Sequence, residues 1–254
     1  MKKCAVSFML LLAGVFSSFT WSANSLHFVA EDLYPLHFEN HDKEPQGFLV
    51  DVVKAVLTHC GCDGRVEIMP QARAFKELQE TPNILMMSLL KTPSREQQFK
   101  FLGPVYNAHA YLLGLKERQF TLTDLQSARG LRVSTVRGYY SQQYLEQAGF
   151  SLERDLVLAP EPASLMKMLY KERTDLVLTN TLSLDKELKN IGLNPRLLEK
   201  KLRLNDFPNE LHITANKQLP QETADKISAS LQAIKESGHY QALLNKWQLK
   251  LETE

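Results

Sequence analysis

Cysteine is scarce in this chain: the 254 residues contain three, and two of them, Cys60 and Cys62, flank a single glycine. A disulfide between these two would close a very small ring with awkward geometry. A metal site has little support, because His59 and Asp63 lie beside the cysteines and not at the distance where a second ligand pair usually occurs. We therefore expect a structural segment, with Cys60 buried on a helix and Cys62 in the following turn, and neither a metal nor a cofactor. The oxidation state of the pair stays open.

Long apolar runs are also lacking: beyond the N-terminal region no segment reaches membrane-spanning length. Near the N-terminus, two lysines precede the apolar residues 5–16, and small residues follow at Ser22 and Ala23. This order is typical of a secretory signal peptide; an uncleaved anchor is the alternative, and the short run disfavours it. We expect a signal peptide over residues 1–23 and export of the mature protein.

An excess of one charge is absent as well. The chain has 30 basic and 29 acidic residues, and removing the two lysines of the signal peptide leaves 28 against 29. A nucleic-acid or anionic-membrane partner needs a clustered basic surface, so neither is expected. Internal repeats and Gly/Ser-rich linkers are missing too. The roughly 230 mature residues suffice for one large domain or two of ordinary size.

What the chain does contain is a regular alternation of strand-like and helical patterns. The continuous apolar run at residues 84–90, for example, is typical of a buried parallel strand. Such alternation favours an α/β fold built from right-handed crossover units. Strands are expected at 26–30, 66–69, 84–90, 131–136, 156–158 and 175–179, and helices at 51–60, 71–79, 140–147, 163–171, 220–236 and 239–247.

Two sets of alternating elements, each about a hundred residues long, predict two lobes. The two C-terminal helices have no strand between them and are best explained as packing on the first lobe. The chain would then cross between lobes near residues 105–110 and 207–211, which makes a hinge. We expect the first lobe to comprise residues 24–107 and 209–254, and the second lobe residues 108–208.

The segment from Leu90 to Glu96 carries the clearest chemical signal. Thr92 is a good N-cap residue and Pro93 suits the first helical position, so a helix is expected to begin here. Arg95 then lies in the first turn, where the helix dipole disfavours a cation by up to about 1 kcal/mol. An anion bound by the guanidinium and the turn's N–H groups would explain this placement. From the residues alone, an anion site and a solvated surface arginine are equal alternatives.

The same segment resembles a known family. With Phe99 and Pro104, the run from Lys91 to Arg95 is similar to the T-P-x-R-x-x-x-F-x-[FW]-x-x-P block of bacterial extracellular solute-binding proteins, family 3. Each matching motif is weak alone, but their ordered sum covers essentially the whole mature chain. The other matches are Tyr34-Pro35 (family pattern Y-P-x-F) and residues 47–52, 70–74, 132–138, 175–180 and 238–247.

This resemblance implies a two-lobed periplasmic-binding-protein-like fold. Each lobe would be a mainly parallel sheet flanked by helices, and a two-strand hinge would join the lobes. It also implies a periplasmic, non-enzymatic binding protein. Such a protein captures a small carboxylate-bearing solute between its lobes and delivers it to the permease of an ABC transporter. A monomer is the default for this architecture.

On the first lobe, the resemblance implies that Arg95 holds the ligand carboxylate. Ser88 and Leu90 would line the same wall and offer mainly backbone groups. Tyr34 would supply an aromatic face, and Glu31 an acidic group at the end of the first strand.

On the second lobe, Gly138 and Tyr139 correspond to the loop and helix start that offer N–H groups to a carboxylate. Arg137 lies beside them and could add positive charge. Arg73, in a segment that matches one branch of the family, has two equally weighted interpretations: a cleft residue or a helix-surface residue.

One position departs from the family pattern. Amino-acid binders usually place an aspartate for the ligand ammonium five residues after the equivalent of Asp175, where this chain has Asn180. A neutral amide does not offset the cost of burying an ammonium. Either Glu31 supplies the missing charge, or the ligand is not a standard α-amino acid. Leu90 likewise replaces the family's threonine.

Two alternatives stay open beside the transport hypothesis. A few relatives on this scaffold are dehydratases of cyclic carboxylates, and Glu31 could serve as a general acid, although no second catalytic residue is evident. The chain could also be the ligand-loaded partner of a membrane receptor, since the sequence does not separate transport from sensing.

Overall fold

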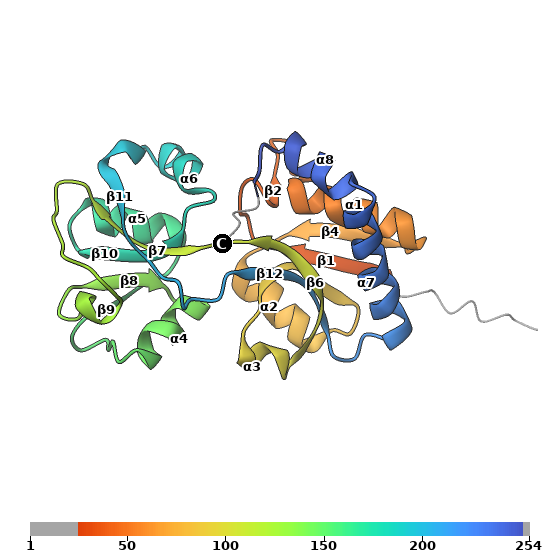
Figure 1. Ribbon diagram of the computed structural model, residues 1–254, viewed down its shortest axis with the longest axis horizontal. Helices are drawn as coiled ribbons and strands as arrows, with labels where there is room; N and C mark the ends of the chain where they lie inside the picture. The colour runs from red at the N-terminus through yellow and green to blue at the C-terminus, as the bar shows by residue number, and fades with distance from the viewer. Residues whose placement is uncertain (1–24, 251–254) are drawn as a thin grey trace, which may run out of the picture.

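The strands of the protein form two separate five-stranded sheets, one in each half of the molecule (Figure 1). The computed structural model describes residues 25–250, so the expected signal peptide lies outside the described residues. The first sheet has the order β4 (Gly64–Ile68), β1 (Leu26–Ala30), β5 (Ile84–Leu90), β12 (Glu210–Asn216), β6 (Phe99–Asn107). The second has the order β11 (Leu198–Arg203), β7 (Ala110–Leu115), β10 (Leu176–Asn180), β8 (Val133–Val136), β9 (Leu156–Ala159).

Both sheets are mixed. In the first, β1 is parallel to β4 and β5, while β12 is antiparallel to β5 and β6. In the second, β8 is parallel to β9 and β10, while β7 is antiparallel to β10 and β11. The parallel strands are those joined by helices, and the antiparallel pairs involve strands that lead toward the other sheet. The α/β fold predicted from the sequence is confirmed, but the sheets are mixed and not mainly parallel, because β7 and β12, the strands that follow the two connections, run antiparallel to their neighbours.

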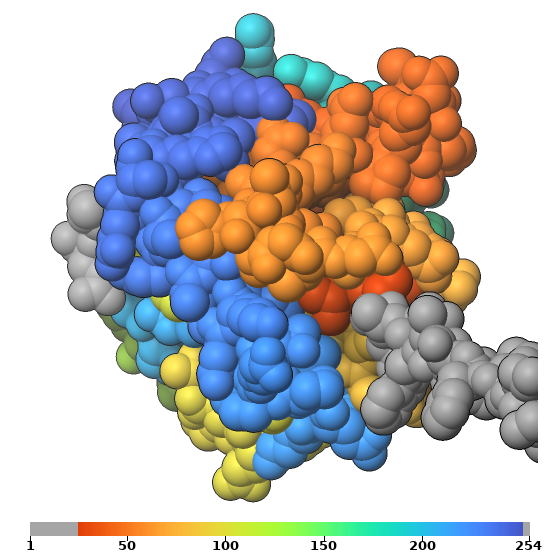
Figure 2. Space-filling model, turned by 90° about the vertical axis from the view of Figure 1, so that its right-hand side faces the viewer, coloured from red at the N-terminus to blue at the C-terminus, as the bar shows by residue number. Residues whose placement is uncertain are grey.

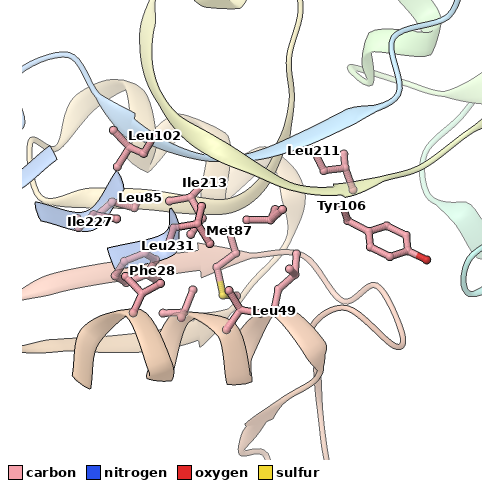
Figure 3. Close-up of a cluster of buried hydrophobic side chains, with 14 of the residues drawn as sticks. Phe28, Leu49, Leu85, Met87, Leu102, Tyr106, Leu211, Ile213, Ile227 and Leu231 are labelled. Atoms are coloured by element: carbon pink, nitrogen blue, oxygen red, sulfur yellow. The ribbon is translucent and has the colours of Figure 1, made fainter. Parts of the chain in front are cut away.

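Helices cover both faces of the first sheet. Successive residues of a strand face opposite sides, and Phe28 of β1 packs with α1 (Phe48–Cys60), α7 (Gln221–Glu236) and α8 (His239–Lys246). Figure 3 shows this cluster, with Phe28 close to Leu231. Val29, the next residue of β1, packs on the other face against α2 (Gln71–Glu80). The C-terminal helices therefore pack on the first sheet.

Figure 2 shows the outer surface of this half, where the C-terminal helices, in blue, lie directly against the orange segment that contains α1. An ion pair joins them: Lys246 Nζ lies 2.7 Å from Asp51 Oδ2. The smaller elements of this half are β2 (Phe38–Glu39) and β3 (Pro45–Gln46), which form a two-stranded sheet, and α3 (Pro93–Glu96).

The second sheet is covered in the same way. Leu176 and Leu178 of β10 share a core with α4 (Tyr140–Gln147). Val177, between them, packs on the opposite face with α5 (Pro162–Tyr170) and α6 (Leu184–Asn190). Each half thus has its own apolar core on both faces of its sheet.

Two connections join the halves. The chain leaves the first sheet after β6, enters the second at β7, and returns between β11 and β12. The connections lie side by side, because the N–H of Ala108 donates a hydrogen bond of 2.8 Å to the carbonyl of Asn209. The predicted crossing segments near 105–110 and 207–211 fall at these two connections.

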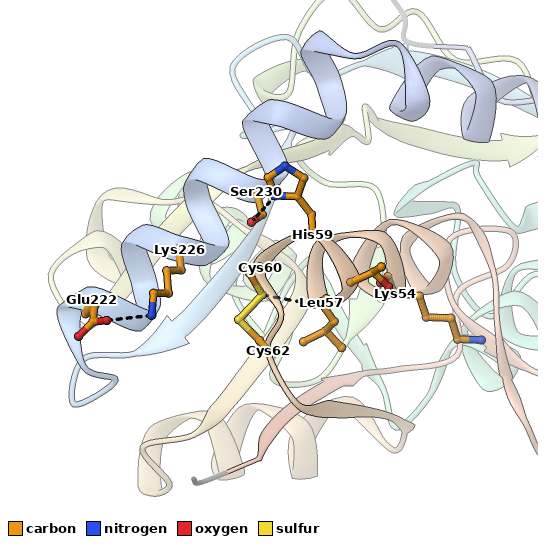
Figure 4. Close-up of a disulfide and its surroundings, with 9 residues drawn as sticks. Lys54, Leu57, His59, Cys60, Cys62, Glu222, Lys226 and Ser230 are labelled. Carbon is orange, nitrogen blue, oxygen red and sulfur yellow. Dashed lines mark hydrogen bonds and ion pairs between the residues drawn. A yellow bond between two sulfur atoms is a disulfide. The ribbon is translucent and has the colours of Figure 1, made fainter.

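A disulfide joins Cys60 and Cys62 at the end of α1 (Figure 4). The two cysteines flank Gly61, which caps the helix in a left-handed conformation with φ 63°. The two Cα atoms then lie 5.2 Å apart, within the range that a disulfide spans. Cys60 ends the helix, as predicted, but it is only partly buried, and Cys62 lies just after the turn at Gly61 and not in it.

Within residues 25–250, no helix is long and apolar enough to span a membrane. The same residues contain no group of three or more His, Cys, Asp or Glu side chains that could hold a metal ion.

Candidate functional site

A cavity of about 150 Å³ lies between the two halves of the molecule and is lined by residues from both sheets. An artificial apolar cavity of about this volume accommodates benzene, so the space suits a compact solute. Six of the residues predicted for the site line it: Glu31, Ser88, Leu90, Arg95, Tyr139 and Asn180.

Arg95 enters the cavity from α3, which begins as predicted. Thr92 is the N-cap, its side chain accepts a hydrogen bond from the N–H of Arg95, and Pro93 is the first helical residue. Because this helix has only one turn, the contacts of the guanidinium itself hold the Arg95 side chain in place. Its Nη1 donates a hydrogen bond of 3.1 Å to the carbonyl of Leu90, and its Cζ lies 5.8 Å from the ring centroid of Tyr140.

The charge of Arg95 is not balanced by a carboxylate: among the described residues no ion pair includes it. Burial lowers the pKa of its guanidinium, which means that the protein solvates this cation less well than water does. An anionic ligand group would restore the missing interaction, and a guanidinium binds a carboxylate through two parallel hydrogen bonds. The geometry therefore favours the anion site over the solvated surface arginine.

Glu31 and Tyr139 meet across the cavity. Glu31 follows β1 in the first half, Tyr139 precedes α4 in the second, and the phenol donates a hydrogen bond to Oε2 of the carboxylate. Burial raises the pKa of Glu31 to about 7; the bond from Tyr139 opposes this rise, and the charges of Glu187 and Asp32 add to it. Burial, followed by the charge of Glu31, also raises the pKa of Tyr139. The pKa of the Glu31 carboxyl thus lies near neutral pH, well above that of an ordinary glutamate.

A buried histidine lies behind the cavity wall. His37 is fully buried; its Nδ1 lies 2.6 Å from the carbonyl oxygen of Glu31, and its Nε2 lies 2.6 Å from Oγ of Ser88. Burial lowers its pKa to about 4, so the ring is neutral at physiological pH. His37 was not among the predicted site residues. The signal available was its position three residues after Tyr34, where the family pattern Y-P-x-F has phenylalanine.

Asn180 lies at the end of β10, where its Oδ1 accepts a hydrogen bond of 3.1 Å from the N–H of Leu182. This bond shapes the turn that follows the strand and uses one acceptor position of the amide. Within the described part of the chain, its Nδ2 donates no hydrogen bond. Asn180 is therefore anchored at the cavity without a charge, as the sequence indicates.

Four of the predicted residues do not line the cavity. Arg73 is 61% exposed on α2 and forms an ion pair of 2.9 Å with Glu77. Arg137 and Gly138 are exposed, and the N–H of Gly138 donates to the side chain of Gln142. For Arg73, the structure corresponds to the helix-surface interpretation.

Tyr34, the fourth, lies beside a neighbouring hollow that also receives residues from both halves. There, Lys186 Nζ of α6 lies 3.7 Å from the centroid of the Tyr34 ring and 4.4 Å from that of Phe38. This cation–π contact is a further bridge between the halves, beside the hydrogen bond from Tyr139 to Glu31 and the contact of Arg95 with the Tyr140 ring.

Other residues complete the wall without having been predicted as ligand contacts. Tyr140 and Phe207 are both cavity residues of the second half, and their rings pack against each other with centroids 5.4 Å apart. Gln71 enters from the start of α2. Their roles depend on tertiary packing, which local sequence patterns do not reveal.

Comparison with known proteins places these features in a family. A relative from Escherichia coli strain K12, provisionally named ABC transporter arginine-binding protein 2, is 27% identical to this chain over 258 residues. The match covers 97% of this chain and 99% of the relative. A histidine kinase sensor domain with similarity to periplasmic binding proteins matches 91% of this chain and 98% of its own, with a TM-score of 0.80 at 19% identity. An ancestral arginine-binding protein bound to arginine matches 88% of this chain and 97% of its own, with a TM-score of 0.73 at 21% identity. These likenesses support the periplasmic-binding-protein-like fold. The model of bacterial extracellular solute-binding proteins, family 3, matches residues 27–250, and the chain belongs to this family.

Proposed function

We propose that this protein captures a small carboxylate-bearing solute in the cavity between its halves and delivers it to the permease of an ABC transporter in the periplasm. The observation that carries this proposal is Arg95, a partly buried guanidinium at the cavity with no carboxylate partner among the described residues. The solute's carboxylate would supply that partner. Residues 24–107 and 209–254 would form one lobe and residues 108–208 the other, with the paired connections acting as the hinge.

The chemistry of the cavity favours an amino acid or a close relative of one. Arg95 provides one cationic anchor, and Glu31 provides one titratable carboxyl within the same space. The E. coli relative and the ancestral protein bear names that refer to arginine, which makes arginine a first candidate for this chain as well. The cavity of about 150 Å³ is small for so long a side chain, so arginine would require the halves to separate further.

A thermal-unfolding screen of the mature protein against amino acids and small organic acids tests the proposal. A ligand that binds only the folded state and is present at about ten times its Kd should add about 1.4 kcal/mol, which raises Tm by about 3–6 °C. Shifts with carboxylates, and none with the corresponding amides or esters, are the expected result. A panel without any shift from a carboxylate would contradict the proposal.

One observation favours a second candidate function, dehydration of a cyclic carboxylic acid. Glu31 has a pKa raised to about 7 and lies in the same cavity as an arginine, and this pKa is the one a general acid needs near neutral pH. Arg95 would hold the substrate carboxylate. Glu31 would protonate the departing hydroxyl as its C–O bond breaks, and the resulting Glu31 carboxylate would take a proton from the neighbouring carbon as the C=C bond forms, so that one water leaves in total. Mass-spectrometric detection of a product lighter by one water would support this function, and unchanged substrate would exclude it for the acids tested.

A further inference from the structure

The side chain of Lys186 lies over two aromatic rings in the hollow beside the cavity. Its Nζ is 3.7 Å from the ring centroid of Tyr34 and 4.4 Å from that of Phe38. The two rings belong to the first half, with centroids 5.1 Å apart, and Trp247 packs edge-on against Phe38. Lys186 belongs to α6 of the second half, on the side that faces β2 (Figure 1). The ammonium group thus lies over the ring faces, the part of an aromatic cluster that attracts cations.

The hollow and the cavity are neighbours along one stretch of chain. Glu31 and Leu33 line the cavity. Asp32 and Tyr34, which alternate with them in the sequence, line the hollow. Pro162, at the start of α5, lines both spaces. A solute held in the cavity would therefore place in the hollow any group that extends past Pro162.

The surroundings of the hollow favour a positive charge. Besides the rings that Lys186 covers, two carboxyl groups line it, Asp32 from the first half and Glu187 from the second. The charge of Lys186 acts on this environment. Burial raises the pKa of Asp32, and a main-chain hydrogen bond and the charge of Lys186 oppose the rise. The position that suits the cation of a ligand is thus filled by a side chain of the protein itself.

We propose that Lys186 is a specificity-determining residue that closes the hollow to cationic ligand groups and limits the site to compact carboxylates. The inference rests on the proposed function and deepens it by narrowing the class of solute. A ligand cation would have to displace Lys186 from the rings, which forfeits that contact, or lie beside it at like charge. A short or neutral solute leaves the contact intact. Arginine should therefore bind more weakly than its neutral analogue citrulline.

Ligands that differ only in the charge of their distal group test the proposal. L-arginine and L-citrulline form one pair, and 5-guanidinopentanoate and 5-ureidopentanoate form a second pair without the α-amine. Isothermal titration calorimetry on the mature protein measures the ratio of the affinity for the cationic member to that for the neutral member. Displacement titrations against the tightest-binding carboxylate of the thermal screen extend the range to weak ligands.

Lys186→Met should change this ratio. The ratio should be below one in the unaltered protein. It should rise by about 10-fold in the variant, because a ligand cation then no longer has to displace another cation from the rings. The variant also lacks one contact between the halves, but that loss weakens both members of a pair by a common factor, which cancels in the ratio.

Two lysine variants provide the controls. Lys186→Arg keeps a cation that can lie over the same rings, so its ratio should equal that of the unaltered protein. Lys189 is exposed in the last turn of the same helix, and Lys189→Met changes the net charge of the protein by the same amount as Lys186→Met. Lys189→Met should leave the ratio unchanged.

Three results would overturn the inference while the proposed function stands. The first is a ratio in Lys186→Met within about 3-fold of that of the unaltered protein. The second is an equal rise in Lys189→Met, which would assign the effect to net charge. The third is a Lys186→Met variant that binds compact carboxylates but neither member of either pair, because the emptied hollow would then not accept a cation. Absence of binding by every carboxylate would overturn the proposed function as well.

Discussion

Arg95→Ala should weaken carboxylate binding by about 30-fold to several thousand-fold, the loss expected when one partner of a desolvated charge pair is removed. Among the described residues that line the cavity, Arg95 is the one lysine or arginine, so no neighbouring cation is in place to replace it. Calorimetric titration with the tightest-binding carboxylate of the thermal screen measures the loss. Stability should change little, because the Thr92 cap does not depend on the arginine side chain.

Arg73→Ala is the matched control for this variant. Arg73 belongs to the same half of the molecule, but its guanidinium is 61% exposed and pairs with Glu77 outside the cavity. Its removal should leave the affinity unchanged. If Arg95→Ala bound the carboxylate as tightly as the unaltered protein, or if Arg73→Ala lost as much, the anion site would be assigned to the wrong residue.

Glu31 and His37 should make opposite contributions to the pH dependence of the unfolding free energy, so that each contribution is seen only when the other residue is replaced. The pKa of Glu31 is raised from 4.5 to about 7, so its stabilising contribution is complete below pH 4.5 and is lost as pH rises through 7. The pKa of His37 is lowered from 6.5 to about 4, so its contribution is complete above pH 6.5 and is lost as pH falls through 4. Between pH 4.5 and 6.5, unfolding releases one proton from Glu31 and takes up one at His37. The two contributions to the slope of unfolding free energy against pH therefore cancel.

Single substitutions should expose the two slopes separately. Relative to the unaltered protein, Glu31→Gln should gain about 2 kcal/mol of unfolding free energy between pH 4.5 and 6.5, because only the histidine term is left. His37→Phe should lose about 2 kcal/mol over the same interval, because only the carboxyl term is left. Urea unfolding at several pH values measures both slopes.

An exposed carboxylate gives the comparison for these slopes. Glu80 lies on the surface of α2, and Glu80→Gln should follow the unaltered protein across the interval. Other groups with shifted pKa values, among them Asp32, Glu187, His27 and His212, contribute to every variant and largely cancel in the comparison. Parallel curves for Glu31→Gln and His37→Phe would show that neither group titrates with the expected pKa.

Much of the fold could be predicted because its signals are local. The apolar run at residues 84–90 is β5 to the residue, and Gly61 ends α1 where it was expected to. The mixed character of the sheets was harder to anticipate. Strand direction at β12 depends on where the chain re-enters the first sheet, and no residue within the strand encodes that.

The site residues likewise differ in whether a local sequence signal marks them. Arg95 was accessible to prediction because Thr92 and Pro93 mark the start of its helix three and two residues earlier. His37 was not, because its partner Ser88 is 51 positions away and the bond exists only after β1 and β5 have paired. When a buried polar residue has its partner far away in the chain, the pattern of apolar and polar residues in a single sequence does not reveal it.

The bond between Ala108 and Asn209 has a mechanical consequence. If the paired connections act as the hinge, we expect them to resist twisting and sliding and to favour rotation about one axis. Such a rotation would return facing residues to the same alignment. A solute small enough for the cavity would then let Tyr139 meet Glu31 and Lys186 meet Tyr34 each time the halves approach.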